Sequence, residues 1–202
     1  MKRTLHTFFR KDDGSAAIEY VTLLLPLIAL VFTSLQIALA YHFSLTAQKA
    51  VELGARIAAV RDAVHTGLPT TNELNESSGL GVGDECGFGA CVDPGGPWTC
   101  SGETVATDPN CDLARFNEIR NEVARLAYLL DDEDISITYS YGLLGFADGP
   151  FVPIVEVAIE ERPFFLQFFF NLAFSGGEDE SFEVTLPSVA ATAIAEDLSS
   201  TN

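Results

Sequence analysis

A run of twenty residues, 21–40, contains no charged side chain, and it constrains this chain more than any other feature. Twenty helical residues rise about 30 Å, which is close to the hydrocarbon thickness of a bilayer. The run lacks the polar face that a helix on the core of a soluble protein keeps. Its polar side chains are all uncharged: Thr22, Thr33, Ser34 and Gln36. We therefore predict a membrane-spanning helix rather than the buried helix of a soluble domain.

The charges that flank this run predict its orientation. The first eleven residues contain four bases and no acid, and positive side chains near a span stay on the cytoplasmic side. The N-terminus is therefore expected in the cytoplasm, and everything after residue 41 is expected to be exported. The whole chain has 29 Asp and Glu against 11 Lys and Arg, a net charge of -18. This excess of acid predicts that the chain does not bind nucleic acid, because the two would repel each other.

A short motif lies between the basic leader and the apolar run. It reads Gly14-Ser-Ala-Ala-Ile-Glu19-Tyr20, and Pro26 follows inside the run. This sequence resembles the processing site of type IVb prepilins, and in particular the TadE-like minor pilins and pseudopilins of the tight-adherence (Tad or Flp) pilus system. The resemblance covers less than a third of the chain. It implies that a prepilin peptidase cuts after Gly14, which makes Ser15 the first mature residue and places Glu19 and Tyr20 fifth and sixth.

The resemblance also implies a role for Glu19 in assembly. Cleavage would leave a cationic amine on Ser15, and in pilins the equivalent glutamate is thought to meet the amine of a neighbouring subunit. Such a pair would offset the cost of holding a carboxylate in an apolar bundle. The implied partners are the prepilin peptidase, other pilin or pseudopilin subunits, the Tad secretion machinery and the membrane; no cofactor is implied. The implied location is the bacterial inner membrane, as a single-pass protein with a periplasmic C-terminal domain, and then the pilus at the cell surface, where it would take part in cell adhesion.

Two other interpretations stay open from the sequence. The chain could be a membrane-anchored periplasmic binding or structural domain that is never processed. Residues 38–40 read Ala-Leu-Ala, so an ordinary signal peptidase could also cut before Tyr41 and release a soluble domain. The apolar run is longer than the ~7–15 residues of a typical signal-peptide core, which favours a retained helix.

Helical periodicity continues beyond the run, with polar residues returning. We expect one helix over 16–65, whose second half presents an amphipathic face to the exported domain. His42 and His65 are expected on the surface of this helix and not as metal ligands. The expected segments are a leader at 1–14, a transmembrane helix at 15–41, its amphipathic continuation at 42–65, a Gly-, Pro- and Cys-rich loop region at 66–111, and a helix with antiparallel strands at 112–202.

Four cysteines lie in or next to the expected loop region: Cys86, Cys91, Cys100 and Cys111. An even number of cysteines in an exported loop predicts two disulfides, which can pair in three ways. We favour the sequential pairing, Cys86–Cys91 with Cys100–Cys111. A zinc site is the alternative, but the spacing lacks the usual close C-x2-C pairs and no histidine is near. Each disulfide would contribute ~2–4 kcal/mol to a region with little apolar core of its own.

Helix and strand patterns follow in residues 112–202. Apolar residues at steps of three and four predict an amphipathic helix over 112–130: Leu113, Phe116, Ile119, Val123, Leu126 and Leu130. Alternation predicts a strand over 135–141, and further strands are expected over 152–159, 182–186 and 189–194. Two helices that precede several antiparallel strands predict an α+β fold with the helices on one face of a small sheet, as in pilins.

The Phe-rich stretch 164–174 holds six of the fifteen phenylalanines and is too short to span a bilayer. It is expected either in the core or as an apolar docking patch. The acids at 178–180 are expected in a solvated loop rather than in a calcium site. No G-x-S-x-G turn and no phosphate-binding glycine loop accompanies the three histidines. We therefore expect that the chain is not an enzyme.

Overall fold

The computed structural model describes residues 13–127, 134–164 and 184–195. Most of the expected leader lies outside these residues, as do the Phe-rich stretch beyond residue 164 and the acidic loop at 176–180. The chain divides into two units. The first comprises residues 1–42 and 163–185, and the second comprises residues 43–162 and 186–202.

The first unit holds the N-terminal part of α2, a helix of 48 residues (Asp13–Val60) that contains Pro26. From Ile18 onward, α2 is the one described helix that is long and apolar enough to cross a membrane. None of its most apolar stretch is buried. This is the surface expected of a helix whose surroundings are lipid or other helices rather than its own domain.

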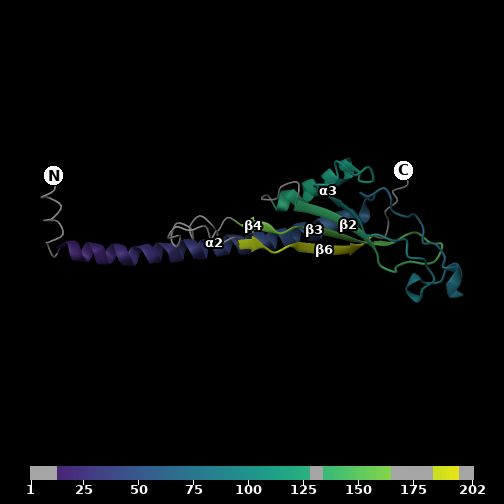
Figure 1. Cartoon of the computed structure of the whole chain (residues 1–202), viewed down its shortest axis with the longest axis horizontal. Coiled ribbons are helices and arrows are strands. Elements are labelled where there is room, and N and C mark those ends of the chain that lie inside the picture. Colours follow the sequence, from purple (N-terminus) through teal and green to yellow (C-terminus); the bar gives the residue numbers. More distant parts are fainter. Residues whose placement is uncertain (1–12, 128–133, 165–183, 196–202) are drawn as a thin grey trace. The chain divides into compact units, whose positions relative to one another are not determined.

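The second unit contains a four-stranded antiparallel sheet in the strand order β1-β2-β3-β6, of which Figure 1 labels β2, β3 and β6. Its strands are β1 (Trp98–Ser101), β2 (Ile135–Tyr141), β3 (Pro153–Ile159) and β6 (Val189–Ile194). A separate two-stranded sheet pairs β4 (Arg162–Phe164) with β5 (Val184–Leu186). The remaining elements are the second helix, α3 (Leu113–Leu126), and two 3-10 turns, η1 (Glu76–Ser78) and η2 (Cys86–Phe88). The expected α+β fold, with a long apolar N-terminal helix and a second helix, is confirmed.

One face of the four-stranded sheet carries the core. Alternate residues of the two central strands are buried there: Ile135, Ile137, Tyr139, Val155, Val157 and Ile159. The second half of α2 packs on this core with mostly small side chains, and α3 packs on it with larger ones. At Gly54 of α2, an added Cβ atom would lie 2.7 Å from Val123 Cγ2 of α3 and 3.2 Å from Val157 Cγ1 of β3. The two helices and the sheet therefore meet at a position where only glycine fits without a shift.

The end of α2 differs from the expectation. The helix stops at Val60, and His65 lies beyond it in a backbone bridge with Cys111. His65 is buried, and its Nδ1 atom accepts a hydrogen bond from the Gly67 N–H (3.1 Å). The prediction that His65 lies on the helix surface was therefore wrong. The reason is that the chain leaves the helix after Val60 to pair with the segment in front of α3.

The second helix is shorter than the expected range. Asp112 caps α3 rather than belonging to it, since its carboxylate accepts from the N–H groups of Ala114 and Arg115. Leu113 and Leu126, expected in the core, are exposed. Only the middle of α3 faces the sheet, so the apolar residues at its two ends remain at the surface. Residues 128–130 of the expected helix lie outside the described residues.

The expected loop region contains a strand that the sequence analysis missed. β1 pairs with β2 in antiparallel register, with Cys100 opposite Ile137. Its four residues lie among glycines and prolines, so the alternation was too short to recognise. β1 forms one edge of the sheet and brings Cys100 into the core.

Candidate functional site

The glutamate motif lies at the N-terminal end of α2. Gly14 and Ser15 are in its first turn, and Glu19 and Tyr20 follow about one turn later with exposed side chains. Residues 15 and 19 are four apart, so they share a helical face and are about 6 Å apart along the axis. The Thr22 hydroxyl donates to the backbone carbonyl of Glu19 (2.8 Å), and the Glu19 carboxylate has no partner among the described residues. The motif therefore presents an unpaired carboxylate one turn from the expected new N-terminus.

A second polar group in the same helix lacks a partner. Gln36 Oε1 is shielded from solvent and accepts no hydrogen bond among the described residues. The Thr33 and Ser34 hydroxyls, in contrast, donate to the carbonyls of Ala29 and Val31. An unpaired amide is unfavourable in a bilayer unless a neighbouring helix supplies its partner. Gln36 is thus a further position at which α2 can engage another helix, and the sequence analysis recorded it only as a polar residue in the run.

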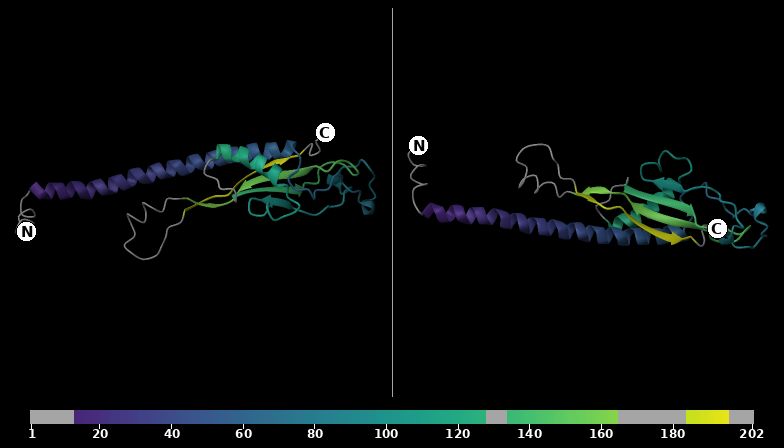
Figure 2. Two further views of the ribbon diagram at one scale, coloured as in Figure 1. Left: turned by 90° about the horizontal axis from the view of Figure 1, so that it is seen from above. Right: turned by 60° about the horizontal axis from the view of Figure 1, so that its bottom comes forward.

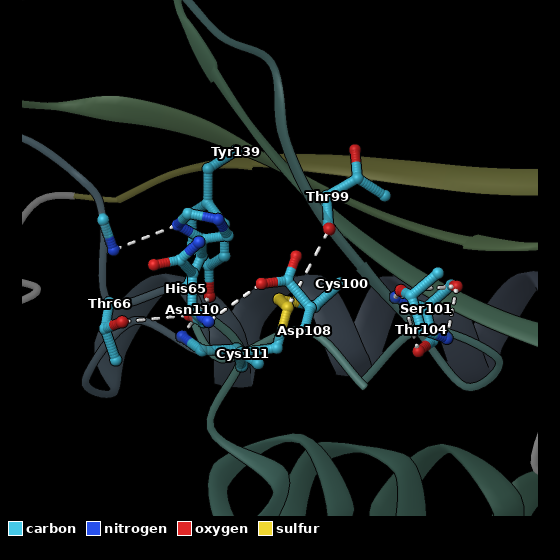
Figure 3. Close-up of a disulfide and its surroundings, with 12 residues drawn as sticks. His65, Thr66, Thr99, Cys100, Ser101, Thr104, Asp108, Asn110, Cys111 and Tyr139 are labelled. Carbon is cyan, nitrogen blue, oxygen red and sulfur yellow. Dashed lines mark hydrogen bonds between the residues drawn. A yellow bond between two sulfur atoms is a disulfide. The ribbon is translucent and has the colours of Figure 1, made fainter. Parts of the chain in front are cut away.

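In the second unit, a disulfide joins Cys100 of β1 to Cys111, the residue in front of the α3 cap (Figure 3). Backbone hydrogen bonds on both sides of Cys111 tie this segment to the chain that leaves α2. Thr66 N–H donates to the Asn110 carbonyl (2.7 Å), and Asp112 N–H donates to the Val64 carbonyl (2.9 Å). The disulfide therefore links an edge strand to the junction between the two helices.

Tyr139 fixes the same junction from the centre of the sheet. Its hydroxyl oxygen accepts a hydrogen bond from the Val64 N–H (3.0 Å). Burial raises the pKa of Tyr139 above its ordinary value of 10.0, against smaller lowering effects of the Val64 hydrogen bond and the nearby Arg115. Arg115 itself donates to the Ala63 carbonyl (2.8 Å) and pairs with Asp62 and Asp112. The sequence alternation placed Tyr139 on the buried face but did not reveal this partner for its hydroxyl.

The second disulfide, Cys86–Cys91, closes a small loop at the end of the sheet. Together the two bonds form the sequential one of the three pairings. Near this loop, the buried Asn72 side chain donates through Nδ2 to the carbonyls of Leu144, Phe146 and Pro150 at 3.1–3.4 Å. Asn72 thereby holds the segment that connects β2 to β3 against the segment that follows α2.

These paired groups hold distant segments of the chain together. Within the described residues, no group of three or more His, Cys, Asp or Glu side chains is placed to hold a metal ion. A groove of about 220 Å³ between the end of α2 and α3 is lined by charged residues that already pair, including Arg61 with Glu118. The described residues thus present an unpaired carboxylate and an unpaired amide oxygen on an apolar helix, together with a cross-linked domain.

Comparison with known proteins found no curated protein and no solved structure that matches this chain. A family model does match part of it. The matched segment contains the motif around Glu19, all of the apolar run and much of the core-facing half of α2. Residues 14–56 match the family of TadE-like proteins, which confirms for this segment the resemblance drawn from its motif.

Proposed function

We propose that this chain is a minor pilin or pseudopilin that takes part in the assembly of a tight-adherence (type IVb) pilus. The observation that carries the proposal is the TadE-like match over a helix of membrane length that begins with the glutamate motif. In this proposal residues 1–14 are a leader, residues 15–41 anchor the chain in the inner membrane, and the remainder is presented in the periplasm. The role is structural, and no catalytic step is assigned to it.

Processing after Gly14 gives the unpaired carboxylate its partner. A prepilin peptidase would release a cationic amine at Ser15, and Glu19 would pair with the amine of a neighbouring subunit. Because a carboxylate in an apolar bundle is unfavourable when it is alone, the pair would favour one axial register between subunits. The unpaired Gln36 amide, several turns further along α2, would be satisfied in the same helix–helix contact.

The exported domain supports the proposed location. All four cysteines are paired, which is typical of proteins that fold in an oxidising compartment such as the periplasm. Residues 42–60 then continue the helix into the domain, 61–65 lead out of it, 66–111 form the cross-linked loop region, and 112–202 supply α3 and most of the sheet. The partners in this proposal are the prepilin peptidase, the other pilus subunits and the Tad secretion machinery.

The test is the N-terminal residue of the mature protein from its native host, with and without the prepilin peptidase. The proposal expects Ser15, and it expects this start to disappear when the peptidase is absent. A start at Met1 would indicate an unprocessed membrane-anchored domain, and a start at Tyr41 would indicate a secreted domain. Either result would overturn the proposal.

A substitution tests the assembly step separately. Glu19→Ala is expected to reduce pilus assembly while the exported domain keeps its disulfides and its resistance to protease. Glu103→Ala is the matched control, since Glu103 is an exposed acid of the second unit that lies outside α2. Equal assembly of the Glu19→Ala variant and the wild type would refute the assigned role of Glu19.

A further inference from the structure

The bases of the second unit are confined to a few parts of its sequence. Its bases lie on or next to the two helices and at the start of β4: Lys49, Arg56, Arg61, Arg115, Arg120, Arg125 and Arg162. Neither the stretch 62–114 nor the stretch 126–161 contains a Lys or Arg. The loops 66–97 and 142–152, which lie at one end of the four-stranded sheet (Figure 2), contain acids and no Lys or Arg. These loops are therefore acidic, whereas the helices carry bases together with acids such as Glu52, Glu118 and Glu122.

The acidic loops also expose large apolar side chains. We define the apolar tip as Val82, Phe88, Leu143 and Phe146, whose exposed fractions are 69, 78, 54 and 52%. Acids lie next to them in the sequence, all exposed: Asp84, Glu85 and Asp148. Several exposed apolar side chains on neighbouring loops are typical of a surface that docks on another protein.

The apolar tip is held in place by backbone contacts between its two loops. Gly83 N–H donates to the Ala147 carbonyl (3.0 Å), Ala147 N–H donates to the Asp84 carbonyl (2.9 Å), and Cys86 N–H donates to the Gly145 carbonyl (3.0 Å). The Cys86–Cys91 disulfide closes one loop. These contacts present the tip as an ordered surface.

The backbone at Leu143 is a second sign that the tip is built for contact. Leu143 has φ of 57°, in the left-handed region that is unfavourable for a side chain with a Cβ atom. Glycine would adopt this conformation without cost, yet a large, half-exposed leucine is present. Unfavourable backbone at an exposed position points to a role for the side chain itself.

A complementary surface lies on α2. We define the basic stripe as Leu45, Lys49, Arg56 and Val60, which are spaced by four, seven and four residues and so share one exposed face of the helix. Val60 is 75% exposed. Neither Lys49 nor Arg56 has an ion-pair partner among the described residues, and no ion pair joins either base to Glu52 at the edge of the stripe. The stripe thus combines two unpaired bases with two exposed apolar side chains.

We propose that the apolar tip of one copy of this chain docks on the basic stripe of a second copy. Apolar side chains would meet apolar side chains, and the acids beside the tip would face Lys49 and Arg56. A tip-to-tip contact would instead bring acids together, and an anionic lipid surface would repel them. The contact is heterologous: each copy keeps one unused tip or stripe, so that further copies can be added. The proposal does not depend on processing after Gly14.

The experiment measures self-association of the full chain in a non-ionic detergent by sedimentation velocity. Phe88→Ser removes the most exposed side chain of the tip. Leu143→Gly removes another, and glycine adopts the left-handed backbone conformation at this position without strain. The stripe variant carries Lys49→Glu and Arg56→Glu together. Each is expected to weaken association by roughly tenfold or more, the loss typical of an anchor residue at an interface. Salt at about 1 M, where the Debye length is about 3 Å, is expected to weaken the wild-type contact as well.

Mixing the variants identifies the geometry. The mixture is made at a concentration at which the wild type associates and each variant alone is monomeric. A tip variant mixed with the stripe variant is then expected to form a dimer and nothing larger, because one supplies an intact stripe and the other an intact tip. Controls are Leu126→Ser and Arg125→Glu, which alter an exposed apolar residue and a base on α3 outside both surfaces; these should associate like the wild type. Any of three results would overturn the proposal. The wild-type chain could stay monomeric at about 0.1 mM, the tip and stripe variants could associate like the wild type, or the mixture of variants could stay monomeric. Association driven by the membrane part of α2 would persist in every variant, which distinguishes it from association through the tip and the stripe. If the docking proposal fails, the N-terminal residue of the mature protein still tests the proposed function independently.

Discussion

Gly54→Ala tests how closely the two helices and the sheet approach. In an exposed helix the change would stabilise the protein by about 1 kcal/mol, because alanine is the better helix former. Here the new Cβ would lie 2.7 Å from Val123 Cγ2 and 3.2 Å from Val157 Cγ1, and both valines are fully buried. Overpacking of a filled core costs about 1–3 kcal/mol. We expect a net loss of about 1 kcal/mol in the free energy of unfolding.

The assay is urea unfolding of the full chain in detergent, followed by the fluorescence of Trp98, the single tryptophan. Trp98 is half-buried and packs edge-on against Phe151 at 5.8 Å, so it reports on the second unit. Gly81→Ala is the matched control, because its new Cβ would meet no atom closer than 3.9 Å. This control is expected to change stability little or to raise it by about 0.4–1 kcal/mol.

A second substitution makes the reasoning refutable. Val123→Ala removes the methyl group that the new Cβ would approach most closely, and alone it is expected to cost about 2 kcal/mol through the cavity it leaves. In that background Gly54→Ala is expected to become stabilising, because the new methyl group fills vacated space. An equal effect of Gly54→Ala in both backgrounds, or stabilisation of the otherwise unaltered chain, would refute the close approach described above.

Three further substitutions, one of them with a matched control, probe other contacts by the same unfolding assay. Tyr139→Phe leaves the buried Val64 N–H without an acceptor and is expected to cost about 1–3 kcal/mol, whereas Tyr141→Phe is expected to be neutral because the Tyr141 hydroxyl has no described partner. Because burial raises the pKa of Tyr139, the native state keeps a proton that the unfolded state releases above pH 10. The free energy of unfolding should therefore fall as pH rises above about 10, and it should fall less steeply in Tyr139→Phe. Equal pH dependence of the two proteins would contradict this. Asp112→Ala removes the α3 cap and is expected to cost about 1 kcal/mol, and no change would show that the cap adds nothing. Cys100→Ser removes the disulfide to Cys111 and is expected to lower the free energy of unfolding by about 3 kcal/mol. Unchanged stability of the wild type after reduction would argue against this value.

Elements with a regular pattern could be predicted from the sequence. The alternation of Ile135, Ile137 and Tyr139 defines a strand with one buried face, and β2 has the expected bounds. The apolar run and the motif before it predicted a long helix, because an uncharged stretch of that length has few alternatives. The glutamate motif was likewise recognisable from local sequence, and the family match covers it.

Features that depend on distant parts of the chain could not be predicted in this way. The residues before His65 have helical periodicity, but His65 pairs with Cys111 and the helix ends at Val60. Leu113 has the spacing of a core residue, yet the sheet does not reach it. The apolar tip was equally hidden, since its two loops are brought together only by backbone pairing between distant segments, as between Glu85 and Phe146.

The small side chains on the core face of α2 have a consequence during synthesis. Gly54 is made roughly 100 residues before its neighbour Val157 in β3, which at ~5–20 residues per second is on the order of 10 s. Until α3 and then the strands are made, the face that will be buried has nothing to cover it. Most of its residues are alanines (Ala47, Ala50, Ala55 and Ala58), and each presents little apolar area. The uncovered face of α2 therefore binds chaperones and other nascent chains less strongly than a leucine-rich face would. The larger side chains that complete the core are made later, on α3 and the strands.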